Sequence, residues 1–218
     1  MGKGRLIFKK EGSAIYISHL DTMRTLTRVF LRAGIPLRHT EGFNPHPYIS
    51  LALPLSVGHS SVCELMDFEI TSELPPDALP NLLNPNMPSG LTAVRAYTPI
   101  RKIGEIKWLS ICGALEYGGG APDLSALSGY FAAKSIIIEK KTKRGAAPLD
   151  VIPLISKLEF TAVSDTAVSL HAVIAAQNPS LNPGSLVTAL KTHRPELAPE
   201  LAAFTRLALL DAELEIFE

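Results

Sequence analysis

The spacing of hydrophobic residues changes several times along the first hundred positions, and this order constrains the fold more than any other feature. Apolar side chains alternate within residues 5–10, 49–55, 66–70 and 91–97, as in strands with one buried face. Two segments between them, at 19–33 and 75–84, have the flanking signals of helices. The order βαββαβ is typical of a ferredoxin-like domain, an antiparallel sheet with two helices packed on one face.

The first helix has the clearest boundaries. Ser18 followed by Asp21 approximates a capping box, and Gly34 before Pro36 is a stop signal, so we expect a helix of about 15 residues. The short segment before it, residues 14–17, is expected to be extended. One side of the helix is predicted to face the core: Leu20, Met23, Thr27 and Phe30, with Leu26 and Ala33 beside them.

A similar order follows a predicted linker at residues 98–102. We expect strands at 107–115, 135–141, 158–163, 168–175 and near 207–215, and helices at 124–133 and 184–191. The predicted protein is therefore α+β, with tandem ferredoxin-like antiparallel sheets. Its predicted domains are residues 1–99, which carry a basic first helix and a proline-rich loop, and residues 106–218.

Charge is segregated along the chain although the formal net charge is zero. Residues 1–60 hold eight Lys and Arg against three Asp and Glu, whereas residues 61–100 hold one against five. A basic segment of this kind suits a polyanionic partner. A second basic cluster lies mid-chain: Lys140, Lys141, Lys143 and Arg144.

No apolar run approaches the roughly 20 residues of a membrane-spanning helix, and the opening residues leave no room for a secretory leader. We therefore expect a soluble, cytoplasmic protein without a membrane partner. Cys63 and Cys112 are far apart and outside any metal-binding spacing, so neither a metal site nor a cofactor is expected.

Three arginines recur on the first helix at intervals of four: Arg24, Arg28 and Arg32. They form one stripe about 12 Å long, since each helical residue rises by about 1.5 Å. Such a stripe can be an ordinary solvated face, with the arginine stems lying over apolar neighbours. It can also bind successive phosphates of a nucleic acid strand, because a guanidinium group binds phosphate bidentately.

Several segments together resemble the radical-SAM-linked protein family. They are YISHLD at 16–21, RAGIPL at 32–37, GFNPHP at 42–47, residues 140–150 and NPSLNP at 178–183. Members of that family occur alone or fused behind a radical-SAM enzyme domain, so the resemblance implies a radical-SAM protein as a partner. The chain lacks the three-cysteine cluster motif of such enzymes and is not itself the radical generator.

The favoured interpretation is a non-catalytic accessory module that binds RNA, either tRNA or rRNA. Phe43 or Tyr48 could stack an unpaired base, which is the usual way in which single-stranded RNA is read. The predicted RNA-binding residues are Arg24, Arg28, Arg32, Arg38, Lys9, His39, Phe43, Asn44, His46, Lys140, Lys141, Lys143 and Arg144.

Two alternatives remain open. His19 and His46 could act as acid and base in a metal-independent endoribonuclease, although either could instead have a structural role, and the spacing of His19, His39 and His46 gives no support for zinc. The chain could also be a protein-interaction or substrate-presenting partner of a radical-SAM enzyme, docking through Glu64, Asp67 and Glu69 or through the acidic residues at its carboxyl end. A protein-docking surface should expose apolar atoms, whereas an RNA-binding surface should be a basic groove.

Overall fold

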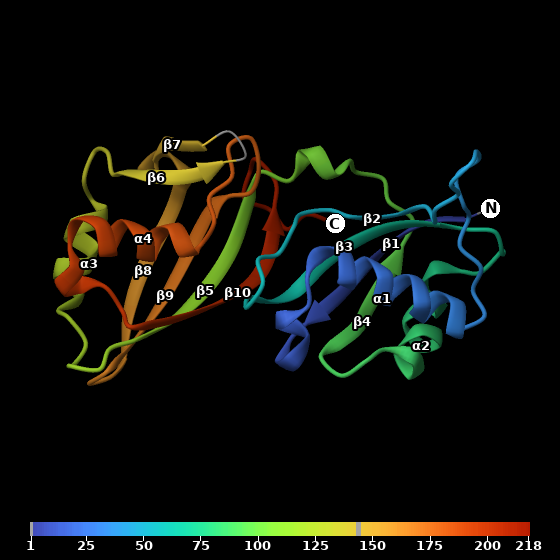
Figure 1. Cartoon of the computed structure of the whole chain (residues 1–218), viewed down its shortest axis with the longest axis horizontal. Coiled ribbons are helices and arrows are strands. Elements are labelled where there is room, and N and C mark those ends of the chain that lie inside the picture. The colour runs from blue at the N-terminus through green and yellow to red at the C-terminus, as the bar shows by residue number, and fades with distance from the viewer. Residues whose placement is uncertain (1, 143–144) are drawn as a thin grey trace. The chain divides into compact units, whose positions relative to one another are not determined.

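A computed structural model describes residues 2–142 and 145–218 (Figure 1). The chain divides into two compact units, one reaching from the amino terminus to residue 105 together with Glu218, the other comprising residues 106–217. Each unit combines an antiparallel sheet with helices, so the predicted mixed α+β class is confirmed. Within the described residues, no helix is long and apolar enough to span a bilayer.

The sheet of the first unit has the strand order β4-β1-β3-β2, with antiparallel neighbours throughout. Its strands and helices are β1 (Gly2–Lys10), α1 (His19–Arg32), β2 (Ile49–Leu51), β3 (Ser60–Ile70), α2 (Leu79–Leu83) and β4 (Leu91–Tyr97). Short 3-10 helices at Pro76–Ala78 and Asn84–Asn86 flank α2. One face of the sheet packs with α1 and α2 around a common core, which includes Phe8 of β1, Phe30 of α1 and Phe68 of β3.

Helix α1 begins and ends where the local signals predict. Ser18 is the N-cap and its side chain accepts a hydrogen bond from the Asp21 backbone N–H, while Gly34 follows the helix with a φ of +69°. A positive φ is the conformation that glycine adopts most readily, so this residue suits the end of the helix.

The buried side of α1 differs from the prediction. Thr22, Leu26, Val29 and Phe30 are buried, whereas Leu20 is 62% exposed. The buried arc is therefore turned by about a quarter of a circle from the expected one, at about 3.6 residues per turn. Thr22 was not among the predicted core residues, but its hydroxyl donates to the Ser18 carbonyl at 2.9 Å and so can be buried while keeping a hydrogen bond.

The segment before α1 also differs from the prediction. Residues 14–17 were expected to be extended, but Gly12–Tyr16 form a 3-10 helix. The Ala14 N–H donates to the Glu11 carbonyl at 3.1 Å, and the Ile17 N–H donates to the Ala14 carbonyl at 3.2 Å. These local hydrogen bonds satisfy backbone groups that a strand would have paired with a neighbour.

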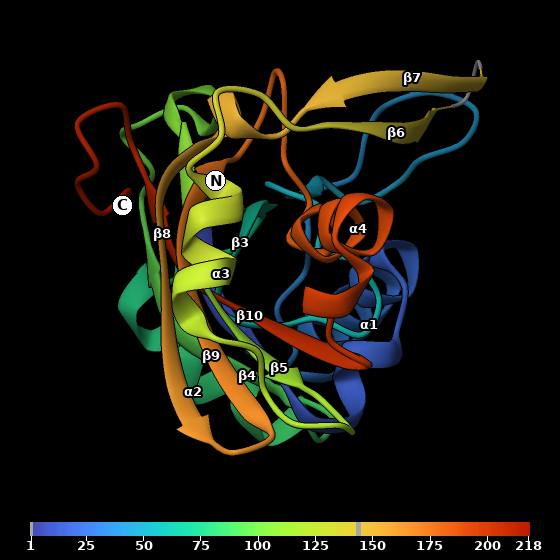
Figure 2. The same cartoon turned by 90° about the vertical axis from the view of Figure 1, so that its left-hand side faces the viewer.

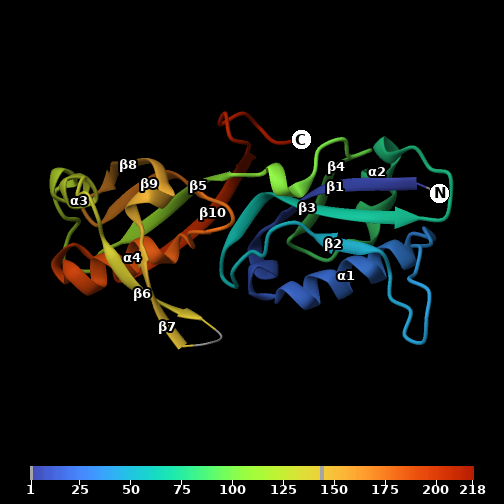
Figure 3. The same cartoon turned by 90° about the horizontal axis from the view of Figure 1, so that it is seen from above.

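The second unit has a main sheet of order β10-β5-β9-β8 and a separate two-stranded sheet, β6-β7. Its elements are β5 (Trp108–Glu116), α3 (Leu124–Phe131), β6 (Ile137–Thr142), β7 (Gly145–Asp150), β8 (Ile155–Ser164), β9 (Ala167–Ala175), α4 (Gly184–His193) and β10 (Leu201–Leu210). Helix α3 packs along β8, and α4 packs along β6 (Figure 2). The β6-β7 hairpin projects away from the main sheet of this unit (Figure 3).

The last strand lies earlier than predicted. It spans Leu201–Leu210, whereas the expected strand was near 207–215. The chain turns after β10, because the Asp211 side chain accepts hydrogen bonds from the backbone N–H groups of Glu213 and Glu215 at 3.1 and 3.0 Å. The alternation of Ala212 and Leu214 with acidic residues thus belongs to a turn and not to a strand.

Candidate nucleic-acid interface

The three arginines of α1 lie on the exposed side of the helix, but they have different surroundings. Arg24 forms an ion pair with Asp21 at 3.1 Å, in which both side chains are largely exposed. Hydrogen bonds from the Ser18 hydroxyl and from Arg24 lower the pKa of the Asp21 carboxyl. Arg28 and Arg32 have no ion-pair partner among the residues that the structure describes.

Arg28 and Arg32 line one groove on the surface of the first unit. Its volume is about 370 Å³, and none of its described lining residues is a carboxylate. The groove therefore presents two uncompensated positive charges, together with hydroxyl groups that can donate to phosphate oxygens. The lining residues come from three segments: Thr25, Arg28, Val29 and Arg32 of α1, Ser13, Ala14 and Ile17 of the preceding turn, and Pro88 and Ser89.

A tight backbone contact fixes the wall of this groove. The Glu11 N–H donates to the Gly90 carbonyl at 2.8 Å, which holds residues 88–90 against the turn before α1. Gly90 has a φ of +85°, and a Cβ at this position would lie 2.3 Å from the Glu11 carbonyl oxygen. Only glycine fits here without a backbone shift. We refer to this site as the helix groove.

Most other basic residues of the amino-terminal segment are engaged elsewhere. Arg5 is 1% exposed and forms a two-pronged pair with Asp67, at 2.6 and 2.9 Å. Lys10 is buried and donates to the Ile17 carbonyl at 2.9 Å. Burial lowers the pKa of Lys10, against the opposing effect of the Glu64 carboxylate. Lys9 is half-buried on β1, opposite Thr92 of β4.

The proline-rich loop is closed at its neck by Thr40 and His46. The His46 backbone N–H donates to the Thr40 hydroxyl oxygen at 3.1 Å, and the His46 Nδ1 lies 3.1 Å from that oxygen. In the other direction, the Thr40 backbone N–H donates to the His46 carbonyl at 2.9 Å. At the tip of the loop, Phe43 is fully exposed and Asn44 is also exposed. His39 donates from Nδ1 to the Leu37 carbonyl at 3.0 Å. His46 and His39 thus have structural contacts.

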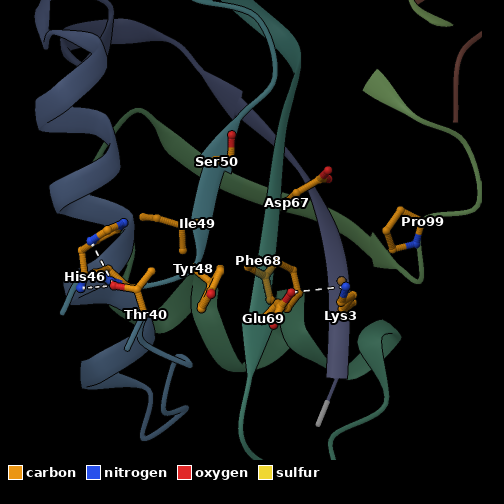
Figure 4. A pocket seen from close by; sticks show the side chains of 12 residues that line it. Lys3, Thr40, His46, Tyr48, Ile49, Ser50, Asp67, Phe68, Glu69 and Pro99 are labelled. Carbon is orange, nitrogen blue, oxygen red and sulfur yellow. Dashed lines mark hydrogen bonds and ion pairs between the residues drawn. The ribbon is translucent and has the colours of Figure 1, made fainter. Parts of the chain in front are cut away.

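A second cavity lies beside this neck, on the strand face opposite α1 (Figure 4). The face follows from alternation, since Phe68 belongs to the core while its neighbours Asp67 and Glu69 point the other way. We call this cavity, of about 330 Å³, the strand-face pocket. It is lined by Lys3, Gly4, Thr40, His46, Pro47, Tyr48, Ile49, Ser50, Asp67, Phe68, Glu69 and Pro99.

Charged and aromatic side chains are ordered around this pocket. Glu69 pairs with the Lys3 ammonium at 3.5 Å and with the Arg38 guanidinium at 2.9 Å. The guanidinium of Arg38 also lies over the Tyr48 ring, 4.9 Å from its centroid. Arg38 is therefore compensated by a carboxylate, unlike Arg28 and Arg32.

Residues of the arginine stripe and of the proline-rich loop line two different cavities of the first unit. Arg28 and Arg32 line the helix groove, whereas His46 lines the strand-face pocket, and the two cavities have no lining residue in common. His19, the first residue of α1, lines neither of these cavities, so the proposed acid and base pair is not assembled in one of them. Sequence reasoning missed Ser13 and Ser89, and the only signal for a close approach there was the glycine at position 90.

In the second unit, Lys140 of β6 donates to the Ser180 carbonyl at 3.2 Å. Lys141 belongs to the same strand, and Lys143 and Arg144 lie outside the described residues. No group of three or more His, Cys, Asp or Glu side chains that could hold a metal ion occurs in residues 2–142 and 145–218.

Comparison with known proteins identifies the family. A family model described as an uncharacterized protein conserved in bacteria matches residues 3–183. The chain belongs to this family, DUF2344. The family description names no enzyme partner, so the radical-SAM link stays a prediction. No curated protein matches the chain.

Among solved structures, a chain from the crystal structure of a Cbf5-Nop10-Gar1 complex is similar, with a TM-score of 0.54 and 7% identity over 94% of this chain and 48% of that chain. A chain from the archaeal box H/ACA sRNP Nop10-Cbf5 complex has a TM-score of 0.49 and 8% identity, over 93% of this chain and 46% of that one. The chain thus spans about half the length of these two structures. At such identities the first likeness concerns the fold alone.

Proposed function

We propose that the protein is a non-catalytic RNA-binding module whose helix groove holds the RNA backbone. The observation that carries this proposal is the pairing of Arg28 and Arg32 in one groove, without an ion-pair partner or a lining carboxylate among the described residues. Phosphate contacts supply much of the affinity of proteins for nucleic acids, and arginine forms the strongest of them.

The geometry of the groove suits two neighbouring phosphates. Residues four apart on a helix are separated by about 6 Å along its axis, which is close to the separation of successive phosphates on one strand. The hydroxyls of Ser13, Thr25 and Ser89 line the same groove and can donate to phosphate oxygens. Phe43, fully exposed at the loop tip, is available to stack on an unpaired base away from the groove.

We further propose that both units are ferredoxin-like. In each, the first strand of the main sheet lies between the last strand and the third, and neighbouring strands are antiparallel. A folded tRNA or rRNA is the proposed ligand, and the cytoplasm the proposed location. A radical-SAM enzyme as partner rests on the sequence resemblance.

One observation favours protein docking as a second candidate function. Leu20 and Leu31 of α1 are 62% and 75% exposed, and they lie on the same side of the helix because they are about three turns apart. Tyr16 is 70% exposed just before the helix. Exposed apolar side chains of this kind are typical of a surface that contacts another protein. Variants of the same helix can therefore be tested both for RNA binding and for binding to a partner enzyme.

The test is filter binding of total tRNA and rRNA at several salt concentrations. We expect the double variant Arg28→Ala/Arg32→Ala to bind about 10- to 100-fold more weakly, and the slope of log K against log salt to fall by about two, one for each phosphate that an arginine no longer neutralises. The control, Lys134→Ala/Lys191→Ala, removes two exposed charges from the second unit and should bind as the wild type does.

Two results would contradict the proposal. In the first, the wild-type protein retains no more RNA on the filter than a neutral control protein does. In the second, both double variants lose the same affinity for RNA. Net charge, and not the helix groove, would then determine RNA binding.

A further inference from the structure

The strand-face pocket has its own chemistry, separate from that of the helix groove. Its lining combines the aromatic ring of Tyr48 and the apolar side chains of Ile49 and Pro99 with an ion pair between the Glu69 carboxylate and the Lys3 ammonium. We propose that this pocket binds a single guanine base, either of a free nucleotide or of an unpaired nucleotide in RNA. Its volume of about 330 Å³ is at the small end of ligand sites, which range from about 300 to 1,000 Å³.

The ring of Tyr48 offers a planar surface on which a base can stack. Figure 4 shows Tyr48 on one side of β3, and Pro99 with Lys3 on the other side. The Arg38 guanidinium over the Tyr48 ring fixes the orientation of that aromatic plane. A base that stacks on Tyr48 therefore meets a ring whose position is already set, which reduces the entropy lost on binding.

The polar edge of the pocket selects among the bases. Glu69 carries two acceptor oxygens, and each can accept a second hydrogen bond besides its contact with Lys3 or Arg38. Guanine presents two adjacent donors, its N1–H and N2–H groups, beside the O6 acceptor. A carboxylate next to an ammonium group matches that edge, because the carboxylate accepts from both donors and the ammonium donates to O6.

The other bases do not match this arrangement. Adenine and cytosine each place one amino donor beside a ring acceptor, and uracil places one N–H between two carbonyls. Each of them would put an acceptor against a carboxylate oxygen, which leaves a polar group without a partner. Asp67 adds a second carboxylate to the lining, although both of its oxygens already bind Arg5.

Backbone hydrogen bonds connect the residues around the polar edge. The Arg38 N–H donates to the Glu69 carbonyl at 2.8 Å, and the Glu69 N–H donates to the Tyr48 carbonyl at 3.0 Å. Glu69 and Tyr48, the two residues assigned to the edge and the face of the base, are thus joined directly through their backbones. The backbone positions of these two residues are thereby fixed before a ligand binds, which reduces the reorganisation that binding requires.

The test is calorimetric titration of the full chain with the 5′-monophosphates of guanosine, inosine, adenosine, cytidine and uridine. We expect guanosine monophosphate to bind at least about tenfold more tightly than the adenosine, cytidine and uridine compounds. Inosine monophosphate lacks the 2-amino group alone and should bind about tenfold more weakly than guanosine monophosphate, as for the removal of one charge-assisted hydrogen bond.

Matched variants locate the site. Glu69→Gln should weaken binding of guanosine monophosphate by about tenfold or more, whereas Glu73→Gln, on an exposed residue outside the pocket lining, should not. Circular dichroism checks that each variant folds. If Glu69→Gln does not fold, Tyr48→Phe should keep binding and Tyr48→Ala should lose it, with the amide shifts of residues 48–50 and 67–69 reporting the position of the ligand.

Equal affinity for all the nucleotides, equal affinity of the Glu69→Gln and Glu73→Gln proteins, or amide shifts confined to other residues would overturn the assignment. A competition experiment distinguishes the two sources of guanine. If the natural ligand is an unpaired guanine in RNA, a single-stranded RNA hexamer with one guanine displaces the bound nucleotide. If the natural ligand is a free nucleotide, the hexamer does not displace it. This titration contains no tRNA or rRNA, so its failure would leave the proposed role of Arg28 and Arg32 untouched.

Discussion

The two faces of the first unit carry their positive charges in different ways. On the strand face, Arg5 and Lys3 of β1 pair with Asp67 and Glu69 of β3, at 2.6 and 3.5 Å. On the helix face, Arg28 has other arginines at its i−4 and i+4 positions, Arg24 and Arg32. A strand places a residue opposite a partner distant in sequence, whereas the nearest side chains on an exposed helix surface are three and four positions away.

This difference explains the charge segregation of the sequence. The basic surplus of residues 1–60 and the acidic surplus of residues 61–100 meet across β1 and β3, where Arg5 lies opposite Asp67 and Lys3 opposite Glu69 in the register. Much of the positive charge is thereby neutralised within the unit. A linear charge count thus overstates the basic surface, and the remaining uncompensated charge is concentrated on α1.

The largest change in stability is predicted for a variant that removes one of the paired charges on the strand face. Asp67→Ala should lower the free energy of unfolding by about 3 kcal/mol, because it leaves the buried Arg5 guanidinium without its carboxylate. Urea denaturation at neutral pH measures this. Asp77→Ala, at an exposed position, is the control, and Arg28→Ala should change stability by no more than about 0.5 kcal/mol. Equal losses for Asp67→Ala and Arg28→Ala would remove the distinction between the two faces.

A smaller effect is expected at Arg38, which is intermediate between the two kinds of site. Its side chain is 34% exposed, pairs with Glu69 and lies over Tyr48. Arg38→Ala should cost about 1 kcal/mol of stability, the sum of a partly screened ion pair and a cation–π contact. Arg38→Lys should restore part of the loss, since it keeps the charge but not the planar group. The same denaturation experiment in 1 M NaCl should show a smaller difference, and an unchanged difference would argue against the ion pair.

The smallest change in stability is expected for a variant of Arg24, the arginine of the stripe that forms an ion pair. The Ser18 hydroxyl and then Arg24 lower the pKa of Asp21, so the ionised carboxyl stabilises the fold above its unfolded-state pKa. That contribution is lost as the pH falls through the lowered folded-state pKa. Arg24→Ala should therefore destabilise the protein less than Arg38→Ala at neutral pH, and the effect should vanish once the pH has fallen below the lowered pKa of Asp21. Unfolding curves of the wild type and of Arg24→Ala, recorded from neutral to acid pH, measure this. A difference in stability that persists at the lowest pH would contradict a stabilising contact between Arg24 and the Asp21 carboxylate.

Features encoded by neighbouring residues could be predicted from the sequence. The ends of α1 follow from Ser18 and Gly34, and the bounds of β4 were predicted at Leu91–Tyr97, as observed. The exposure of Arg28 and Arg32 also follows from their helical spacing. In each case the determining contacts lie within one element or one turn.

Features that depend on distant residues could not be predicted. The rotation of α1 depends on which side chains the sheet accepts, and the buried Thr22 is tolerated only because its hydroxyl bonds to Ser18. The wall of the helix groove depends on the contact between Glu11 and Gly90, which are far apart in sequence.

The neck formed by Thr40 and His46 has a consequence for how this loop can change during evolution. Its hydrogen bonds join the two ends of the loop directly, so the five residues between them make no demand on the register of β2 and β3. Insertions or deletions at positions 41–45 should therefore leave the sheet intact, and each doubling of the loop length should cost only about 0.6 kcal/mol. The sheet therefore imposes no structural requirement on the tip, and any constraint on Phe43 must come from what it binds.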